Sequence, residues 1–211
     1  MRIRILPPSA EVKVSAPLRA NQETIKKFII QKIEWIKLNR QKILSQKFEA
    51  PKKFLDGEFH EFFGEKFLLK ISKDAARPRL LFKDQAFALQ SKKHLNFEQR
   101  KKLFDTFYRK ELKKIVPSFI ENLEKKMHVK VQEFGVKKMK TRWGTCNAKA
   151  RRIWINLELA KKPLACLEYL IAHEMIHFFE SNHNKKFFAH LDFFLPNWRD
   201  EEKKLRESAI R

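Results

Sequence analysis

The chain has 211 residues, of which 43% are hydrophobic, and its 47 Lys and Arg outnumber its 25 Asp and Glu. The hydrophobic content is ample for a core, which excludes a largely disordered chain, and 4 Gly without a glycine-rich motif argue against a phosphate-binding loop fold. The net charge of +22 favours a polyanionic partner such as nucleic acid. Charge spread along the chain is equally compatible with plain solubility.

Cysteine usage and hydropathy predict the compartment. Cys146 and Cys166 form no CxxC pair, which is typical of reduced thiols in the cytosol. No apolar run approaches the length of a membrane span. The N-terminal segment MRIRILPPSAEVKV lacks the continuous apolar core and the cleavage site of a signal peptide. We therefore expect a soluble, cytoplasmic protein with no membrane partner.

The first part of the chain is mostly typical of strands. Residues 2–15 predict two short strands around a Pro7-Pro8 turn. Asn21 can cap an amphipathic helix, in which apolar residues recur at helical spacing from Ile25 to Ile36. Residues 54–89 alternate in short pieces separated by glycine turn signals, which predicts a set of antiparallel hairpins.

The second part of the chain mixes helices and strands. From about residue 96 to 126 the hydrophobic period is helical, and Pro117 should kink or split that helix. Residues 129–134 and 152–157 are typical of strands, with a loop, KMKTRWGTCNAKA, between them. Pro163 opens a further helix, and a charged helix closes the chain. This mixture predicts an α+β fold.

The segment HEMIHFFESNH, residues 173–183, carries the pattern with the clearest chemistry. His173 and His177 are four residues apart and share one face of a helix, with Glu174 at the margin of that face. In this HExxH arrangement two neutral imidazoles bind Zn²⁺, and the glutamate accepts a proton from the metal-bound water. The helix is apolar nearly all round, so Glu174 needs a partner or a polar cavity, which a metal site supplies.

The third metal ligand is less directly defined by spacing. His183 lies ten residues after His173, beyond the expected helix end near Glu180–Asn182, where a returning chain can bring it to the metal. The spacing matches the metzincin pattern HExxHxxGxxH, except that Glu180 replaces the turn glycine. Ser181 and Asn182 must then make the tight turn, and Asn tolerates the left-handed conformation. Glu180 is a rival ligand, or it orients a histidine from behind.

Four ordered blocks of sequence carry a resemblance to a known family. They are KTRWGTCN (140–147), RRIWINLELAKKP (151–163), HEMIHFFESNHNKKFF (173–188) and PNW (196–198). In these blocks the chain resembles the YgjP-like metallopeptidase family, which is related to SprT-like zinc peptidases. The departures, such as Asn184 where the family commonly has Ser, do not touch a proposed ligand.

The resemblance implies a fold and a metal. It implies a zincin-like core, a small mixed sheet plus the metal-binding helix, in residues 96–211. We expect residues 1–95 to form a strand-rich N-terminal region with one amphipathic helix, and the two regions to make one compact unit. The resemblance also implies one zinc per chain, bound by His173, His177 and His183, and Glu174 as general base.

The KTRWGTC block and the strand after it supply candidate substrate contacts. Arg142 near the zinc would stabilise an oxyanion in the transition state or dock an anionic substrate group. The strand Arg152–Asn156 directly precedes the metal helix, and in zincin-like folds such an edge strand holds an extended peptide by main-chain pairing. Trp154 or Ile155 would line that cleft, or both would simply belong to the core.

Three functions are consistent with these features. The first is a zinc metallopeptidase that hydrolyses peptide or protein substrates, and it is the one we expect. The second is a metal-dependent hydrolase of a non-peptide substrate such as a nucleotide phosphoanhydride, although a histidine-rich site suits zinc better than Mg²⁺. The third is a nucleic-acid-associated protein, or a protease acting on nucleic-acid-bound proteins, which the basic charge favours.

Overall fold

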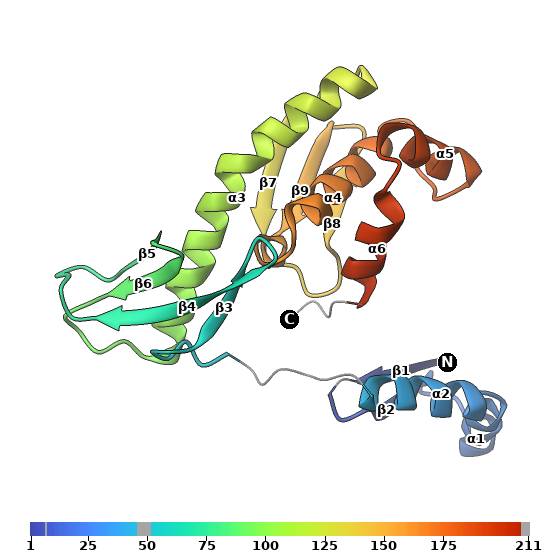
Figure 1. Cartoon of the computed structure of the whole chain (residues 1–211). Coiled ribbons are helices and arrows are strands. Elements are labelled where there is room, and N and C mark those ends of the chain that lie inside the picture. The colour runs from blue at the N-terminus through green and yellow to red at the C-terminus, as the bar shows by residue number, and fades with distance from the viewer. Residues whose placement is uncertain (7, 46–51, 208–211) are drawn as a thin grey trace. The chain divides into compact units, whose positions relative to one another are not determined.

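The computed structural model describes residues 1–6, 8–45 and 52–207, and it confirms the α+β class (Figure 1). The chain divides into two compact units, Met1–Pro51 and Lys52–Arg211. This division lies earlier than the expected boundary at residue 95, because strands after residue 52 share one hydrophobic core with the later helices. The more specific expectation of a zincin-like core stays a prediction.

The first unit begins with the predicted pair of strands. β1 (Arg2–Leu6) pairs antiparallel with β2 (Glu11–Ser15), with Ile3 opposite Val14. The predicted Pro7-Pro8 turn falls partly outside the described residues, since Pro7 is not among them.

Two helices complete this unit where the sequence predicts one. Asn21 caps α1 (Gln22–Gln31), because its side chain accepts a hydrogen bond from the backbone N–H of Thr24 at 2.7 Å. α2 (Ile33–Leu44) follows at once, so the predicted helix is interrupted at Lys32.

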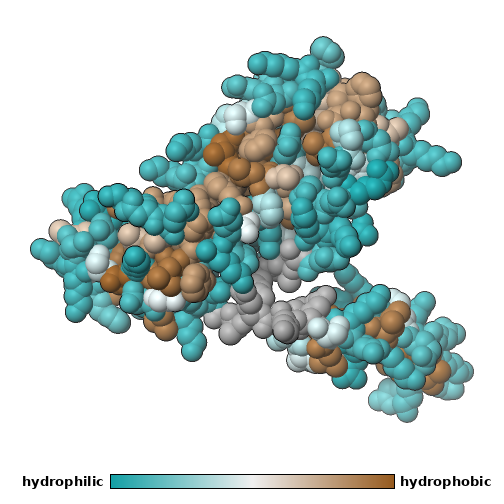
Figure 2. Space-filling view, viewed as in Figure 1, coloured by the Kyte–Doolittle hydropathy of each residue, from teal (hydrophilic) through white to brown (hydrophobic). Residues whose placement is uncertain are grey.

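Hydrophobic surface lies in separate patches among hydrophilic side chains on the face shown in Figure 2. The large exposed apolar side chains of these helices are Ile30, Ile33, Trp35, Leu38 and Leu44.

The second unit contains a four-stranded sheet in the order β3-β4-β6-β5. Its strands are β3 (Phe59–Phe62), β4 (Glu65–Ser72), β5 (Arg79–Lys83) and β6 (Ala86–Gln90). The β3–β4 and β5–β6 pairs are antiparallel as predicted, but β4 and β6 are parallel, which corrects the expectation of antiparallel hairpins throughout. The second hairpin joins the sheet through β6 because β6 is the more buried strand, with Phe87 and Leu89 in the core.

A single long helix, α3 (Phe97–Met127), connects the two sheets of this unit. Pro117 lies inside it without splitting it, although a proline in a helix interior removes a hydrogen bond and costs about 3 kcal/mol. Burial offsets this cost, since seven side chains along one face of the helix are buried. The four-stranded sheet lies by the N-terminal half of α3, and the second sheet lies along its C-terminal half (Figure 1).

The second sheet has three strands in the order β7-β9-β8. They are β7 (Glu133–Lys137), β8 (Gly144–Asn147) and β9 (Arg152–Asn156). Two expectations are corrected here. The KMKTRWGTCNAKA segment is not wholly a loop, because it contains β8, and β9 is the central strand rather than an edge strand. The edge strand beside the histidine helix is β8.

Four short helical elements follow β9. They are the 3-10 helix η1 (Leu157–Lys161), α4 (Leu164–Ile176), α5 (Lys185–Phe194) and α6 (Trp198–Glu207). α4 begins directly after Pro163 as predicted, and it packs against both β8 and β9. α4 ends at Ile176, earlier than the predicted end near Glu180–Asn182. In the part of the chain that the structure describes, no helix combines the length and hydrophobicity of a membrane span.

Candidate metal centre

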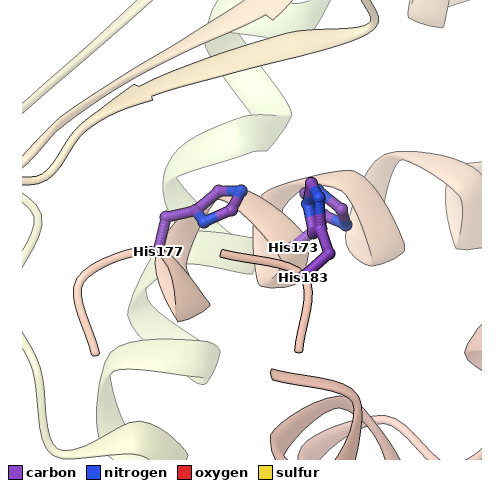
Figure 3. A group of neighbouring side chains, drawn as sticks. All are labelled: His173, His177 and His183. Carbon is purple, nitrogen blue, oxygen red and sulfur yellow. The ribbon is translucent and has the colours of Figure 1, made fainter. Parts of the chain in front are cut away.

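The side chains of the three histidines predicted as ligands lie close together (Figure 3). His173 lies in the last turn of α4, His177 is the residue that ends this helix, and His183 precedes α5. One ring nitrogen of each lies within 4.8 Å of the others, and the two Nε2 atoms of His173 and His183 are 3.0 Å apart. Two nitrogens on one tetrahedral zinc, each about 2.0–2.1 Å from it, lie about 3.3 Å apart. The spacing of the His173 and His183 nitrogens therefore suits a shared ion.

The turn that returns His183 to the helix differs from the predicted one. None of residues 178–183 has a positive φ, so the expected left-handed Asn182 is wrong. The turn tightens instead through two backbone N–H groups, of Phe179 and Glu180, that both donate to the carbonyl of Ile176 at 2.9 and 3.0 Å. Asn182 contributes its carbonyl, which accepts from the N–H of residue 184 at 2.8 Å. A turn glycine is therefore unnecessary.

Glu180 orients a histidine through its main chain rather than its carboxylate. Nδ1 of His177 lies 2.9 Å from the carbonyl oxygen of Glu180, so Nδ1–H donates there and Nε2 is left for a metal. The carboxylate of Glu180 accepts from the Asn184 amide at 2.8 Å, and it is not part of the group of metal donors among the described residues. Asn184, absent from the predicted set, also caps α5. Its position before an apolar run is the signal that indicates this cap.

Phe187 is the principal site residue that the sequence analysis missed. Its side chain is 0% exposed, and its ring centroid lies 4.9 Å from those of His173 and His177 and 4.6 Å from that of His183. Aromatic packing against all three imidazoles restricts their orientations. The hydroxyl of Tyr169 lies 3.4 Å from Nδ1 of His173. Apolar spacing in α5 predicts that Phe187 is buried, but not what it contacts.

The histidines lie in an environment that favours their neutral form. Burial, followed by repulsion from His177 and His183, lowers the pKa of His173 to about 3. Burial, followed by repulsion from His177, also lowers the pKa of His183. Neutral imidazole is the form that binds a metal, so no proton has to leave these two rings near neutral pH.

Glu174 is buried against the edge strand β8. Glu174 is 5% exposed, and burial raises the pKa of its carboxyl to about 8. The positive charge of Arg142 acts in the opposite direction and lowers this pKa. A Cβ atom at Gly144 would lie 2.6 Å from Oε1 of Glu174. Burial and the charge of Glu174 raise the pKa of the Cys146 thiol to about 11. Gly144 and Cys146 are alternate positions of β8 and therefore share the side of the strand that faces Glu174, and Arg142 lies two residues before Gly144.

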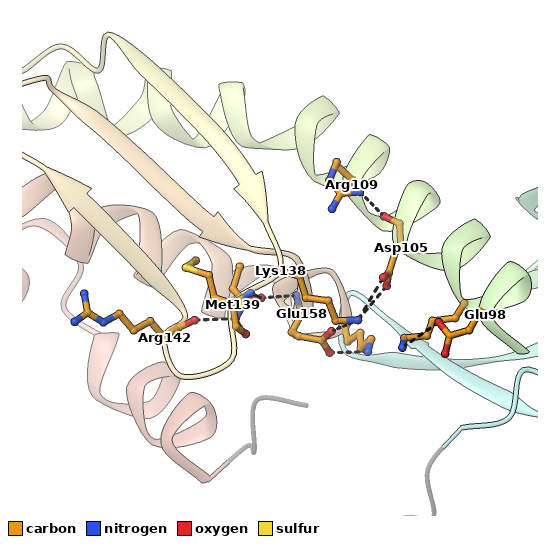
Figure 4. A network of polar contacts seen from close by, with 10 residues as sticks. Glu98, Asp105, Arg109, Lys138, Met139, Arg142 and Glu158 are labelled. Atoms are coloured by element: carbon orange, nitrogen blue, oxygen red, sulfur yellow. Dashed lines mark hydrogen bonds and ion pairs between the residues drawn. The ribbon is translucent and has the colours of Figure 1, made fainter.

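A buried polar network fixes the segment that leads into β8 (Figure 4). The amide of Asn156, which is 0% exposed, donates to the carbonyls of Met139 and Arg142 at 3.0 and 2.7 Å. Its oxygen accepts from the N–H groups of Met139 and Glu158 at 3.3 and 3.2 Å. The carboxylate of Glu158 pairs in turn with Lys138 at 3.6 Å. The main chain of Arg142 is thus held in place, while its side chain is exposed.

The two residues predicted to line a substrate cleft are explained by packing. Ile155 is 0% exposed and lies in the core, so a direct substrate contact has no support. Trp154 points to the face of the sheet opposite Ile155, where its ring covers Gly135. The Nζ atom of Lys137 lies 4.7 Å from the centroid of this ring. Because β9 is paired on both sides, it has no free edge for a peptide.

The buried carboxyl predicts how stability depends on pH when no metal is bound. The folded pKa of Glu174 is about 8 and its ordinary value is 4.5, so the unfolded chain loses this proton first. The free energy of unfolding of the chelator-treated protein should therefore fall as the pH rises from about 4.5 to 8. The Glu174→Gln variant has no carboxyl at this position and lacks this effect. The Tm of the variant minus the Tm of the wild type should therefore increase as the pH rises from about 5 to 8. His173 titrates in both proteins, and its effect cancels in this difference. A gain that is constant across this range would contradict the raised pKa.

The close approach of Gly144 to Glu174 makes a second prediction. In Gly144→Ala the new methyl group must displace the carboxylate, whose Cγ and Cδ it would also meet at 3.0 and 3.1 Å. We expect the free energy of unfolding to fall by about 1–3 kcal/mol, as for other overpacked cores, with zinc still bound. Denaturant unfolding and elemental analysis measure these quantities. The matched control is Thr145→Ala, on the other side of the strand. Equal stability of the two variants would contradict the contact.

These features together define a class: an α+β protein with a candidate metal site of three histidines beside a buried carboxylate, the arrangement of a metal-dependent hydrolase. The chain belongs to the YgjP-like family, because residues 1–208 match the family described as YgjP-like, metallopeptidase domain. The resemblance seen in the sequence is thus confirmed, and at family level the chain is a metal-dependent peptidase.

Comparison with solved structures finds the crystal structure of the metallopeptidase zymogen of Methanocaldococcus jannaschii jannalysin. The two chains share 21% sequence identity with a TM-score of 0.39, over 44% of this chain and 94% of that one. No curated protein matches the chain.

Proposed function

We propose that the protein is a zinc-dependent peptidase in which His173, His177 and His183 bind the metal and Glu174 is the general base. The observation that carries the proposal is the convergence of three imidazole nitrogens within 4.8 Å of one another. The buried carboxylate of Glu174 directly follows one of these histidines, His173, in the chain. Membership of a metallopeptidase family supports peptide hydrolysis as the reaction.

The donor set fits zinc better than the alternatives. Three imidazoles suit Zn²⁺, whereas Mg²⁺ and Ca²⁺ prefer oxygen ligands, and no carboxylate belongs to this group among the described residues. A zinc ion bound there would polarise the scissile carbonyl and lower the pKa of water. The choice of donors also makes hydrolysis of a nucleotide phosphoanhydride, which generally uses Mg²⁺, the weaker hypothesis.

The residues of the chain supply proton transfer and substrate alignment. Glu174 accepts the proton of the attacking water and returns it to the leaving amine, and the positive charge of Arg142 favours its ionised form. We propose that the exposed Arg142 side chain stabilises an oxyanion or docks an anionic group. One edge of β8 has no strand partner in the described part of the chain, so we propose it, in place of β9, for pairing with an extended peptide.

The test is metal removal and replacement in a cleavage assay. The purified full chain is stripped with a chelator, reloaded with either Zn²⁺ or Mg²⁺, and incubated with a peptide library read by mass spectrometry. We expect cleavage with zinc alone, and a parallel assay for release of phosphate from ATP should stay negative. Zinc-dependent ATP hydrolysis without peptide cleavage would favour the non-peptide hydrolase instead.

A further inference from the structure

A cationic cavity lies in the second unit, apart from the histidine site. Its volume is about 290 Å³, and it is bordered by β4, by the segment after β6 and by the first turn of α3. Four permanently basic side chains line it: Lys73, Lys92, Lys93 and Arg100. His94 joins them, and no Asp or Glu of the described residues lines the cavity. None of the proposed metal ligands takes part, so this is a separate place on the molecule.

The positive charge of the cavity is not neutralised by the protein. Among the described residues no carboxylate pairs with any of the four basic side chains, whereas many surface lysines elsewhere do form such pairs. Asp74, adjacent in sequence to Lys73, is occupied by the hydroxyl of Ser72 and the amide of Gln90. Four like charges around one hollow repel each other, so the arrangement is unfavourable unless an anion binds there.

Arg100 gives the strongest indication of a missing partner. Its Nε is buried without a hydrogen-bond partner, and a buried, unpaired N–H of a charged group is costly. Among the residues that the structure describes, two other side chains have a buried nitrogen of this kind, Arg152 and His60. Each of those lies within salt-bridge distance of a glutamate, at 3.1 and 3.4 Å, but no carboxylate is paired with Arg100 in the described chain. Arg100 is therefore the one of the three that needs an external acceptor.

The remaining lining of the cavity limits what that acceptor is. Ile71, Leu89 and Leu95 supply apolar surface beside the basic groups, and the volume lies near the lower end of the roughly 300–1,000 Å³ of small-ligand pockets. A free inorganic anion would leave this apolar surface uncovered. A ligand with an anionic head and a compact organic part covers both, and the planar fork of arginine matches the oxygens of a phosphate.

We propose that this cavity binds a phosphate ester of nucleotide size, with the phosphate held by Arg100 and the three lysines and the organic part on the apolar side. The same chemistry is offered by a free nucleotide and by a terminal or internal phosphate of a nucleic-acid strand. The proposal goes beyond peptide hydrolysis and does not depend on it. If the ligand is a strand, the cavity ties the peptidase to nucleic acid.

The test measures binding of two probes to the full chain, AMP by calorimetry and a fluorescein-labelled single-stranded DNA oligonucleotide by anisotropy. The cavity variant is Lys92→Gln, Lys93→Gln, Arg100→Gln. The matched control is Lys110→Gln, Lys113→Gln, Lys114→Gln, which removes the same charge from exposed positions of α3. We expect the cavity variant to lose about tenfold or more in affinity and the control variant less than about threefold.

The outcomes separate the two sources of the ligand. A loss of AMP binding confined to the cavity variant identifies a nucleotide site, and a loss seen with the oligonucleotide alone identifies a strand site. Equal losses in the two variants, or no binding of either probe by the wild type, overturn the proposal. Thermal melts establish that the variants fold. Arg100→Lys keeps the charge but not the fork, so its weaker binding provides a second readout if the triple variant does not fold.

Discussion

Replacing either His183 or His173 by alanine should remove zinc from the protein. Each substitution takes away one of three nitrogen donors. The Nε2 atoms of His173 and His183 lie 3.0 Å apart, and the turn after α4 separates these two residues in the chain. Loss of an outer partner of a ligand typically weakens metal binding about 10–100-fold, and loss of a ligand itself should exceed this. Elemental analysis should give about one zinc per chain for the wild type and close to none for either variant.

The matched control for these variants is His190→Ala. His190 lies on α5, where its ring stacks on Phe179 and Phe194 with centroids 5.5 and 6.0 Å away, and it is outside the group of donors. We expect this variant to keep its zinc. Circular dichroism of all variants checks that the fold survives. A His183→Ala protein with a full complement of zinc would show that the third ligand has been assigned wrongly.

The fold follows from the sequence where the signals are local. The Asn21 cap, the strand pair before it and the Pro163 start of α4 are each encoded within a few residues, and each agrees with the prediction. The parallel pairing of β4 with β6 does not, because it depends on which hairpin strand buries Phe87 in the distant core. Local alternation predicts strands but not the neighbours they choose.

The same distinction applies to the site. His173, Glu174 and His177 are brought together by helical spacing alone, so the sequence is enough to place them side by side. β8 could not be recognised, because its positions that face Glu174 are Gly144 and Cys146, which do not form a hydrophobic alternation. These residues contact a buried carboxylate rather than hydrophobic core side chains.

Contacts between separate elements are also beyond the sequence. Phe187 packs on all three histidines from a different helix, and Asn156 fixes the main chain of Arg142 from the neighbouring strand. Both residues have patterns that indicate burial or a strand end, but the patterns do not name the partner. The supporting residues of a site are therefore harder to predict than residues in a local motif.

Replacing Glu174 by glutamine should leave zinc bound while lowering peptide hydrolysis about 10²–10⁴-fold, the usual contribution of a general base. Glutamine has the same shape, so it fits against Gly144, but it cannot accept the proton of the attacking water. Initial rates on a peptide cleaved by the wild type, with zinc content measured on the same samples, give both quantities.

The matched control is Glu168→Gln, an identical change less than two turns earlier on the same helix α4, which we expect to keep nearly full activity. A Glu174→Gln protein as active as this control would assign proton transfer to another group. Loss of zinc together with activity would instead mean that Glu174 supports the metal site. Since the carboxylate lies outside the group of metal donors and against the edge strand proposed to hold the peptide, retained zinc with lost hydrolysis is the result that the geometry favours.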